Sequence, residues 1–257
     1  MWLLIDIGNS ASKVGIFDPT SAVDRVPGEV IRTMRIAHDE PPITKLREFI
    51  AGEPISRAGA VTVVPAQRVR WTEAVRQAAG SDLHFYDNTS DLPIELAYET
   101  PQTLGHDRIA VAVGGWMRFG DPGRSGVIVV DAGTAVNIEV VRPDGVYLGG
   151  IIAPGVELMR DALGLGTAQL PKVDLHLPAS PIGRSTKEAL QSGILHGLLD
   201  GVQGMVNRIR TAETGYYRVV TTGGWGAWVN EQLRADWASD SHLVLKGISD
   251  LIRRADG

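Results

Sequence analysis

Leu-Leu-Ile-Asp-Ile-Gly-Asn-Ser at residues 3–10 and Val-Ile-Val-Val-Asp-Ala-Gly-Thr-Ala at residues 127–135 share one pattern. In each stretch an apolar run typical of a strand ends in Asp-x-Gly, followed by a small amide or hydroxyl residue. The glycines allow a close approach of the backbone, and the neighbouring amides and hydroxyls can donate to phosphate oxygens. Asp6 and Asp131 can hold a cation or a water at the strand ends. One such turn is most often only a turn, but two copies predict a nucleotide held between two related halves.

The composition is that of an ordinary globular protein. The chain has 257 residues, of which 44% are apolar and 21% charged, and this length allows one or two domains. Its net charge of -5 disfavours nucleic acid as a partner, because electrostatic phosphate binding needs a basic face, but it leaves ATP possible. The absence of cysteine excludes disulfides, iron–sulfur clusters and thiolate zinc sites.

The apolar segments argue against targeting and membrane insertion. Met1–Ile7 lacks a basic lead-in and reaches Asp6 almost at once, so we do not expect a signal peptide. No apolar stretch approaches the ~20 residues that cross a bilayer. The sequence therefore predicts a cytoplasmic protein with no membrane partner.

The order of apolar runs predicts an α/β duplication. In the first half, strands are expected at Trp2–Ile7, Lys13–Phe17, Val30–Ile36 and Ala58–Val64. Helices are expected at Ile43–Ala51, Gln67–Ala79 and Ile109–Met117. The second half again begins with three expected strands, at Gly126–Asp131, Val136–Val141 and Val146–Ile152. Helices are expected next at Gly155–Leu163 and Thr186–Arg210, followed by strands at Arg218–Thr222 and Leu243–Leu245 and a final helix through Arg253. Connections between the first three strands are too short for crossover helices, so the sheets are expected to be mixed. A cluster of turn residues between Gly114 and Gly126 predicts the boundary between the two halves, which are then residues 1–118 and 119–257.

The common nucleotide motifs are absent. The sequence has neither a Walker-type phosphate loop nor a complete Gly-x-Gly-x-x-Gly after a strand. A third glycine turn, Thr222-Gly-Gly-Trp, again follows an expected strand. It is either a tight strand-to-helix connection or a surface on which a flat base lies close to the backbone.

An acid and a base stand side by side before the helical run at Ile109. In the segment Tyr98–Arg108, Asp107 could cap that helix and Arg108 could be a solvated neighbour. Alternatively, Asp107 is a general base beside a cationic substrate anchor. His106 is the one histidine inside this motif, and its type and place favour an ordinary loop or helix-start role over a chemical one.

Together these pieces resemble the type III pantothenate kinases, the compact branch of the sugar kinase, heat-shock and actin superfamily. The resemblance covers nearly the whole chain, in the order Asp6–Ser10 with Lys13, Val63–Pro65, Pro101–Arg108, Asp131–Ala135, Gly149–Gly155, Thr167–Pro171, Thr186–Gly193 and Thr222–Gly224. It implies a duplicated ribonuclease H-like (actin-like ATPase) fold, with two halves that each hold a mixed five-stranded sheet and flanking helices.

The resemblance also implies a role for individual residues. The phosphate-1 loop that holds ATP and its Mg²⁺ would be Asp6, Ile7, Gly8, Asn9, Ser10, Ala11, Ser12 and Lys13. Asp131 would bind a monovalent cation (K⁺ or NH₄⁺), Thr134 an ATP phosphate, and Thr222, Gly223 and Gly224 the adenosine. The pantothenate pocket would consist of Tyr98, Gly105, His106, Asp107, Arg108 and Thr186, with Asp107 as proton acceptor and Arg108 against the substrate carboxylate.

The function implied by this resemblance is ATP-dependent phosphorylation of pantothenate to 4′-phosphopantothenate, the first step of coenzyme A biosynthesis, by a homodimer. The alternative is a non-catalytic ATP-binding accessory factor of a transcription system. Retention of Asp107, Arg108 and both phosphate loops favours catalysis. The chain departs from the family pattern at Asn137 and Glu139, where Thr and Asp are common, while Ser10 keeps the hydroxyl of the commoner Thr.

Overall fold

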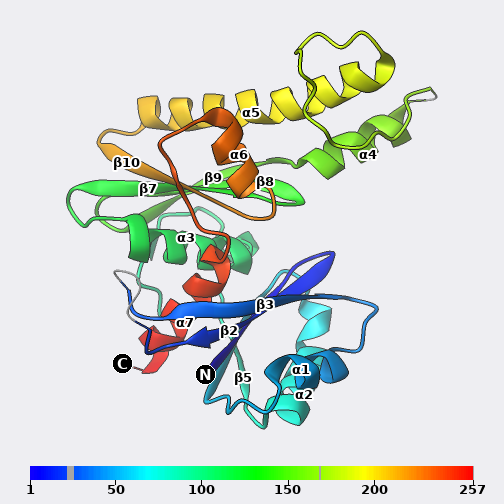
Figure 1. Cartoon of the computed structure of the whole chain (residues 1–257). Helices are drawn as coiled ribbons and strands as arrows, with labels where there is room; N and C mark the ends of the chain where they lie inside the picture. Colours follow the sequence, from blue (N-terminus) through cyan, green and yellow to red (C-terminus); the bar gives the residue numbers. More distant parts are fainter. Residues whose placement is uncertain (22–25, 168, 257) are drawn as a thin grey trace.

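The computed structural model describes residues 1–21, 26–167 and 169–256. It shows two α/β halves, each built on a twisted sheet, stacked with helices between and outside them (Figure 1). Ala168 of the motif Thr167–Pro171 lies outside the described residues. None of the helices in the described part of the chain is long and apolar enough to cross a bilayer.

The first sheet has five strands in the order β3-β2-β1-β4-β5. Its strands are β1 (Trp2–Ile7), β2 (Ala11–Asp18), β3 (Glu29–Ala37), β4 (Arg57–Thr62) and β5 (Leu83–Phe85). β1, β2 and β3 pair antiparallel, whereas β4 and β5 add parallel to β1, so the sheet is mixed as expected. The parallel additions follow helices, because a parallel connection needs a crossover.

The second sheet repeats this order and carries one further strand. Its order is β11-β10-β7-β8-β9-β6, so the first five strands correspond to β5-β4-β1-β2-β3. They are β6 (Glu95–Leu96), β7 (Ser125–Ala132), β8 (Ala135–Val141), β9 (Val146–Pro154), β10 (Tyr216–Thr222) and β11 (Ala238–Ser239). The expectation of five strands is therefore too low for this sheet. The sixth is the two-residue β6, which pairs with the outer edge of β9 and precedes the segment at Tyr98.

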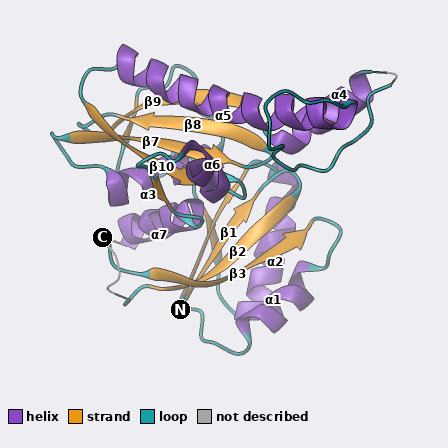
Figure 2. Ribbon diagram, turned by 45° about the horizontal axis from the view of Figure 1, so that its top comes forward, coloured by secondary structure: helices purple, strands orange, loops and turns teal. Residues whose placement is uncertain are grey.

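Helices cover both faces of the second sheet (Figure 2). The helices of the chain are α1 (Pro42–Ile50), α2 (Arg68–Ala79), α3 (His106–Phe119), α4 (Val156–Gly166), α5 (Thr186–Ala212), α6 (Gly226–Leu233) and α7 (Leu243–Asp256), with short 3-10 turns at Pro65–Gln67 and Pro101–Thr103. Ser185 caps the start of α5, and its side chain accepts a hydrogen bond from the Glu188 backbone N–H. Such an N-cap satisfies a donor that the first helical turn leaves unpaired.

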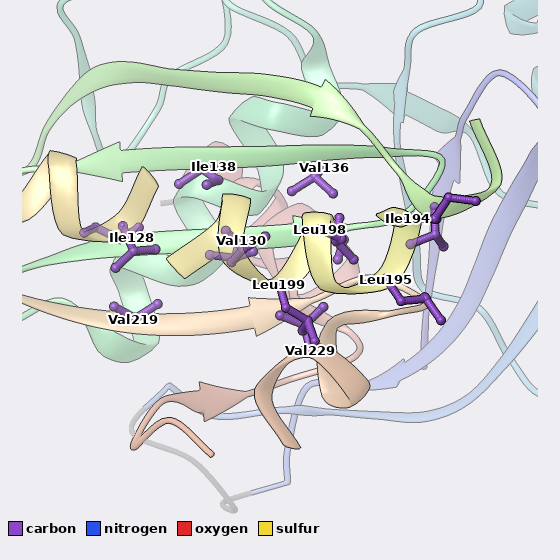
Figure 3. Close-up of a cluster of buried hydrophobic side chains, with 14 of the residues drawn as sticks. Ile128, Val130, Val136, Ile138, Ile194, Leu195, Leu198, Leu199, Val219 and Val229 are labelled. Carbon is purple, nitrogen blue, oxygen red and sulfur yellow. The ribbon is translucent and has the colours of Figure 1, made fainter. Parts of the chain in front are cut away.

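One apolar core lies between α5 and the second sheet (Figure 3). Alternate residues of β7 and β8 point toward α5, including Ile128, Val130, Val136 and Ile138. The other set of alternate residues, such as Val127 and Val129, packs with α3 on the opposite face. This period-two alternation places α3 and α5 on opposite sides of one sheet.

The end of the chain returns to the first half. α7 packs along α3 and touches β1 and β4, so it lies between the two sheets (Figure 1). The expectation of a strand at Leu243–Leu245 is wrong, because Leu245, Ile248 and Ile252 recur at helical spacing and the helix begins at Leu243. The strand that pairs with β10 at that edge of the second sheet is β11. The division of the chain at residues 118 and 119 stays a prediction.

Candidate active site

Two matched glycine turns face each other at the ends of β1 and β7. Gly8 donates its N–H to the carbonyl oxygen of Ala11 at 3.2 Å, and Gly133 donates to that of Ala135 at 2.9 Å. Each turn joins an antiparallel pair of strands and leaves its aspartate at the strand end, as the repeated sequence pattern predicts. The duplication seen in the sequence is thus a duplication of local geometry.

Asp6 and Asp131 are unusually basic carboxylates. Burial, followed by the nearby charges of Asp107 and Asp131, raises the pKa of Asp6 to about 7, against the opposing effect of Lys13. Burial, together with repulsion from Asp107 and Glu139, likewise raises the pKa of Asp131 to about 7, and Lys13 again opposes the rise. Since each charge disfavours ionisation of its neighbours, the three aspartates form one electrostatic cluster between the halves.

Asp107 lies in the first turn of α3, where Gly105 makes room for it. A Cβ atom on Gly105 would come within 2.6 Å of Oδ1 of Asp107, so a side chain there would displace the carboxylate. That same oxygen accepts the backbone N–H of Arg108 at 2.8 Å. Burial raises the pKa of Asp107, while this hydrogen bond and the charges of Arg108 and His106 oppose the rise. Asp107 is not the cap of α3, because the N-cap position is Gly105 and no side chain caps the helix. Its role as a general base stays a prediction.

Arg108 forms a buried ion pair that the sequence did not predict. Its Nε and Nη2 donate to the two carboxylate oxygens of Glu139 at 2.7 and 2.8 Å. The ring of Tyr98 lies beside it, with its centroid 6.0 Å from Cζ of the guanidinium. Arg108 is thus a fixed, nearly buried cation rather than the solvated neighbour that one interpretation expected. Glu139 could be noticed in the sequence because it departs from the family pattern. Nothing in the sequence identified Arg108 as its partner.

The third glycine turn, Thr222–Trp225, packs against the second turn at Asp131 and Ala132. Gly223 has a φ of +83°, and a Cβ atom there would lie 2.4 Å from Oδ1 of Asp131. The next-but-one residue, Trp225, donates its backbone N–H to the carbonyl oxygen of Ala132 at 2.9 Å and its indole N–H to Glu157 at 3.0 Å. A glycine is required at residue 223 because of both its dihedral and this close approach. Trp225 directly follows the predicted adenosine turn, and that adjacency is the signal that could have marked it in the sequence.

A cleft of about 770 Å³ lies beside these turns. It is lined from the first half by Asp6, Ser10, Ala11, Ser12, Lys13, Thr33, Met34 and Arg35, and from the second half by Gly133, Thr134, Glu157, Leu158, Asp161, Gly224 and Trp225. A volume of this order suits a ligand of nucleotide size. Most of the residues expected around ATP thus share one cavity, whereas Asp107, Arg108 and Tyr98 are not among its lining.

Thr186 is the one expected substrate residue that the fold places elsewhere. It is exposed and begins α5, which packs on the opposite face of the second sheet from α3. Tyr98, Gly105, His106, Asp107 and Arg108, in contrast, cluster where α3 begins and β6 ends. Within one chain, Thr186 and the Asp107 turn are therefore separated by the sheet.

The aspartate cluster suits cations. Oδ1 of Asp6 is buried and makes no hydrogen bond to any described residue, and repulsion among the three carboxylates would be relieved by a bound positive charge. In the described part of the chain, no three histidine or carboxylate side chains converge as a ready-made metal site. Phosphate oxygens and water would have to complete the coordination, as is usual for Mg²⁺.

The two related sheets and the cleft between the halves define a fold class, the duplicated actin-like α/β fold. A solved protein described as a Baf family transcriptional activator from Campylobacter jejuni aligns with a TM-score of 0.61 and 20% identity, covering 99% of this chain and 98% of its own. The activator of 2-hydroxyisocaproyl-CoA dehydratase from Clostridium difficile, solved with ADPNP, aligns at 0.51 and 12%, covering 99% and 96%. At these identities the likeness concerns the fold alone.

The sequence relatives are more specific. A family model described as type III pantothenate kinase matches residues 2–208. A type III pantothenate kinase of Frankia alni is 32% identical over 249 residues, covering 96% of this chain and 97% of that protein. One from Symbiobacterium thermophilum is 35% identical over 262 residues, covering 96% and 94%. The chain belongs to the type III pantothenate kinase family.

Proposed function

We propose that the protein transfers the γ-phosphoryl group of ATP to pantothenate and forms 4′-phosphopantothenate, the first step of coenzyme A biosynthesis. The observation that carries this proposal is the meeting of Asp6, Asp107 and Asp131 between two glycine turns, in a chain of the pantothenate kinase family. Phosphoryl transfer needs alignment and charge neutralisation more than covalent help, and this arrangement offers both.

On the nucleotide side, we assign the loop Asp6–Lys13 and Thr134 to the phosphates and Thr222–Gly224 to the adenosine. Seven of these residues line the cleft, which supports the assignment: Asp6, Ser10, Ala11, Ser12, Lys13, Thr134 and Gly224. Asp6 would hold Mg²⁺, and Asp131 a monovalent cation, K⁺ or NH₄⁺. These cations, when bound, neutralise the charge on the phosphate oxygens. The positive charge of Lys13 lowers the pKa of both aspartates and adds a fixed positive charge to the site.

On the acceptor side, Asp107 orients the hydroxyl of pantothenate and accepts its proton. Its raised pKa stays compatible with this task, since a base works best with a pKa near the working pH. Tyr98, Gly105, His106 and Arg108 would line the pantothenate pocket. Because Nε and Nη2 of Arg108 already face Glu139, the pantothenate carboxylate would meet the remaining edge of the guanidinium.

A homodimer is part of the proposal and explains the position of Thr186. If Thr186 contacts pantothenate, a second copy must bring it, because α5 and α3 lie on opposite faces of one sheet. Mixing Asp107→Asn with Thr186→Val tests this arrangement. Each variant alone should be impaired, and mixed dimers should regain activity because one of their two sites has both native residues. No recovery after subunit exchange would show that the sites are not shared.

The transfer itself is tested by incubating the purified protein with ATP, Mg²⁺, K⁺ and pantothenate. We expect 4′-phosphopantothenate by mass spectrometry, ADP in equal amount, and loss of both in Asp107→Asn. ATP binding without turnover would instead favour the accessory-factor alternative, for which the likeness to the Baf family structure gives no support beyond the fold. We also place the reaction in the cytoplasm, where ATP is available and a chain without cysteine needs no oxidising compartment.

A further inference from the structure

Glu139 is a charged side chain placed in an apolar face. It lies on β8 between Val129 of β7 and Gly150 of β9, on the side that packs against α3, and it has no exposed surface. Burying an unpaired carboxylate is costly, so its partners must account for its presence. Those partners are Arg108, in the two-pronged ion pair, and Tyr147, whose hydroxyl donates to Oε2 of Glu139 at 2.6 Å.

The surrounding strand is shaped to fit this ion pair. A Cβ atom on Gly150 would lie 2.7 Å from Oε2 of Glu139 and 3.0 Å from Nη2 of Arg108, so only glycine leaves room for the pair. The hydroxyl of Tyr147 also accepts from Nη2 of Arg108 at 3.2 Å. Three side chains from two strands and one helix therefore form a closed network.

This network continues directly into the substrate turn. The backbone N–H of Arg108 holds Oδ1 of Asp107, and the ring of Tyr98 lies against the guanidinium and within 6.1 Å of the Tyr147 ring. We propose that Glu139 is a positioning residue, which fixes Arg108 and thereby sets the carboxylate of Asp107 and the ring of Tyr98 in place for the acceptor. This inference rests on the proposed pantothenate phosphorylation.

A second buried ion pair on the same helix provides a matched control. Near the other end of α3, Nη1 of Arg118 donates to Asp250 of α7 at 2.5 Å, and both side chains are almost fully buried. This pair lies away from the Asp107 turn. If Glu139 served only to stabilise the fold, its loss and the loss of Asp250 would have the same kind of effect.

The experiment compares Glu139→Gln, Tyr147→Phe and Asp250→Asn with the wild type. Glu139→Gln keeps the shape but turns an NH₂ group toward the guanidinium. We expect its kcat/KM for pantothenate to fall by about tenfold to a hundredfold, the usual consequence of a small misplacement, with KM for ATP within about twofold of wild type. Tyr147→Phe leaves both charges in place and should raise KM for pantothenate about threefold to tenfold. Asp250→Asn should lower the melting temperature and leave both KM values within about twofold.

Hydrogen exchange gives a readout that does not depend on turnover. Glu139→Gln and Tyr147→Phe should increase amide exchange at residues 105–109, whereas Asp250→Asn should increase it near residues 114–119. If the wild type fails to phosphorylate pantothenate, the proposed function is wrong while the exchange data still decide whether Glu139 fixes the turn. Unchanged exchange at residues 105–109 together with unchanged pantothenate kinetics in Tyr147→Phe would overturn the inference, even if Glu139→Gln does not fold.

Discussion

Lys13 lies directly opposite Asp6 in the antiparallel pairing of β1 and β2. At the corresponding place in the second half, Asn137 lies opposite Asp131 in the pairing of β7 and β8. The repeated turns are thus alike in backbone but different in charge, because only the first has a lysine across from its aspartate. Lys13 is held in place by donating to the carbonyl oxygen of Ser241 at 2.5 Å. We therefore expect a mobile cation to matter more at Asp131 than at Asp6.

This asymmetry leads to a prediction about salt. Replacing Na⁺ by K⁺ or NH₄⁺ should raise the turnover strongly if Asp131 binds a monovalent cation next to the ATP phosphates. Asp131→Asn should weaken that dependence and raise KM for ATP, because the neutral amide attracts the cation less. The measurement is initial rate against ATP in the three chloride salts at constant ionic strength. Equal rates in all three salts would contradict the assignment.

A second prediction concerns the acceptor pocket. Tyr98→Phe keeps the aromatic ring beside Arg108 and removes only the hydroxyl. If that hydroxyl binds pantothenate, KM for pantothenate should rise roughly tenfold to a hundredfold, since a hydrogen bond to a charged group is worth about 1.5–3 kcal/mol. KM for ATP should change little. A lower melting temperature with unchanged kinetic constants would show that Tyr98 has only a structural role.

Arg108→Ala should behave differently from Tyr98→Phe. It removes the proposed substrate anchor and also leaves the Glu139 carboxylate buried without its cation. Removing one partner of a buried ion pair typically costs about 3–5 kcal/mol, so both the melting temperature and the affinity for pantothenate should fall. Thermal unfolding and pantothenate kinetics of the same preparation separate the two effects. A stable Arg108→Ala protein would mean that the pair contributes little to folding.

Much of the fold could be predicted from the sequence because strands and turns have local signals. The repeated Asp-x-Gly turns after apolar runs predicted the duplication, and the short strand connections predicted mixed sheets. β6 was not predicted, because a strand of two residues is too short to show a periodicity in the sequence. It is recognised only by its pairing with β9. Leu243–Leu245 was assigned to a strand because three residues cannot separate a period of 2 from one of 3.6.

The site was predictable to the extent that it consists of turns. Asp6, Asp107 and Asp131 each lie beside a glycine or at a helix start, and the structure brings all three together. The Arg108–Glu139 pair joins residues 31 apart through tertiary packing, so no local pattern indicates it. The position of Thr186 depends on which face of the sheet α5 covers, which the periodicity of a helix does not specify.

The raised pKa of Asp6 predicts an unusual dependence of stability on pH. The folded carboxyl has a pKa of about 7 against an ordinary value of 3.8, so the folded state holds its proton more tightly. This contribution is present at low pH and is lost as pH rises between these values. In cation-free buffer at about pH 8, Asp6→Asn should therefore melt higher than wild type, by at least about 2 °C, the shift that ~1 kcal/mol produces in a chain of this size. The difference should vanish near pH 4, and a lower melting temperature at pH 8 would contradict the prediction.

The turn Thr222–Gly224, which we propose holds adenosine, offers a matched pair of glycines. Gly223→Ala should destabilise the protein by about 1–3 kcal/mol, because the new Cβ would meet Asp131 and Ala132 at a positive φ. Gly224→Ala places its Cβ in open space within the cleft, so the melting temperature should stay near that of wild type. If adenosine lies against this turn, Gly224→Ala should nevertheless raise KM for ATP. An unchanged KM for ATP would place the base elsewhere.

The sharpest prediction concerns Asp107. Asp107→Asn keeps the shape and the acceptor for the Arg108 backbone N–H, so the start of α3 should survive. Burial disfavours the charged carboxylate, so the neutral amide should not lower the melting temperature. ATP binding should also persist, because Asp107 does not line the cleft that holds the phosphate loops. The value of kcat should nevertheless fall by about 10²–10⁴, the usual contribution of a positioned acid–base group.

The opposing interpretation makes a different forecast for the same variant. If Asp107 only stabilises the first turn of its helix, Asn serves equally well there and turnover should stay close to wild type. Steady-state kinetics with both substrates saturating, together with ATP titration and thermal unfolding, separate the two cases. Turnover above roughly a third of wild type would rule out proton acceptance by Asp107, because a positioned base contributes far more than threefold.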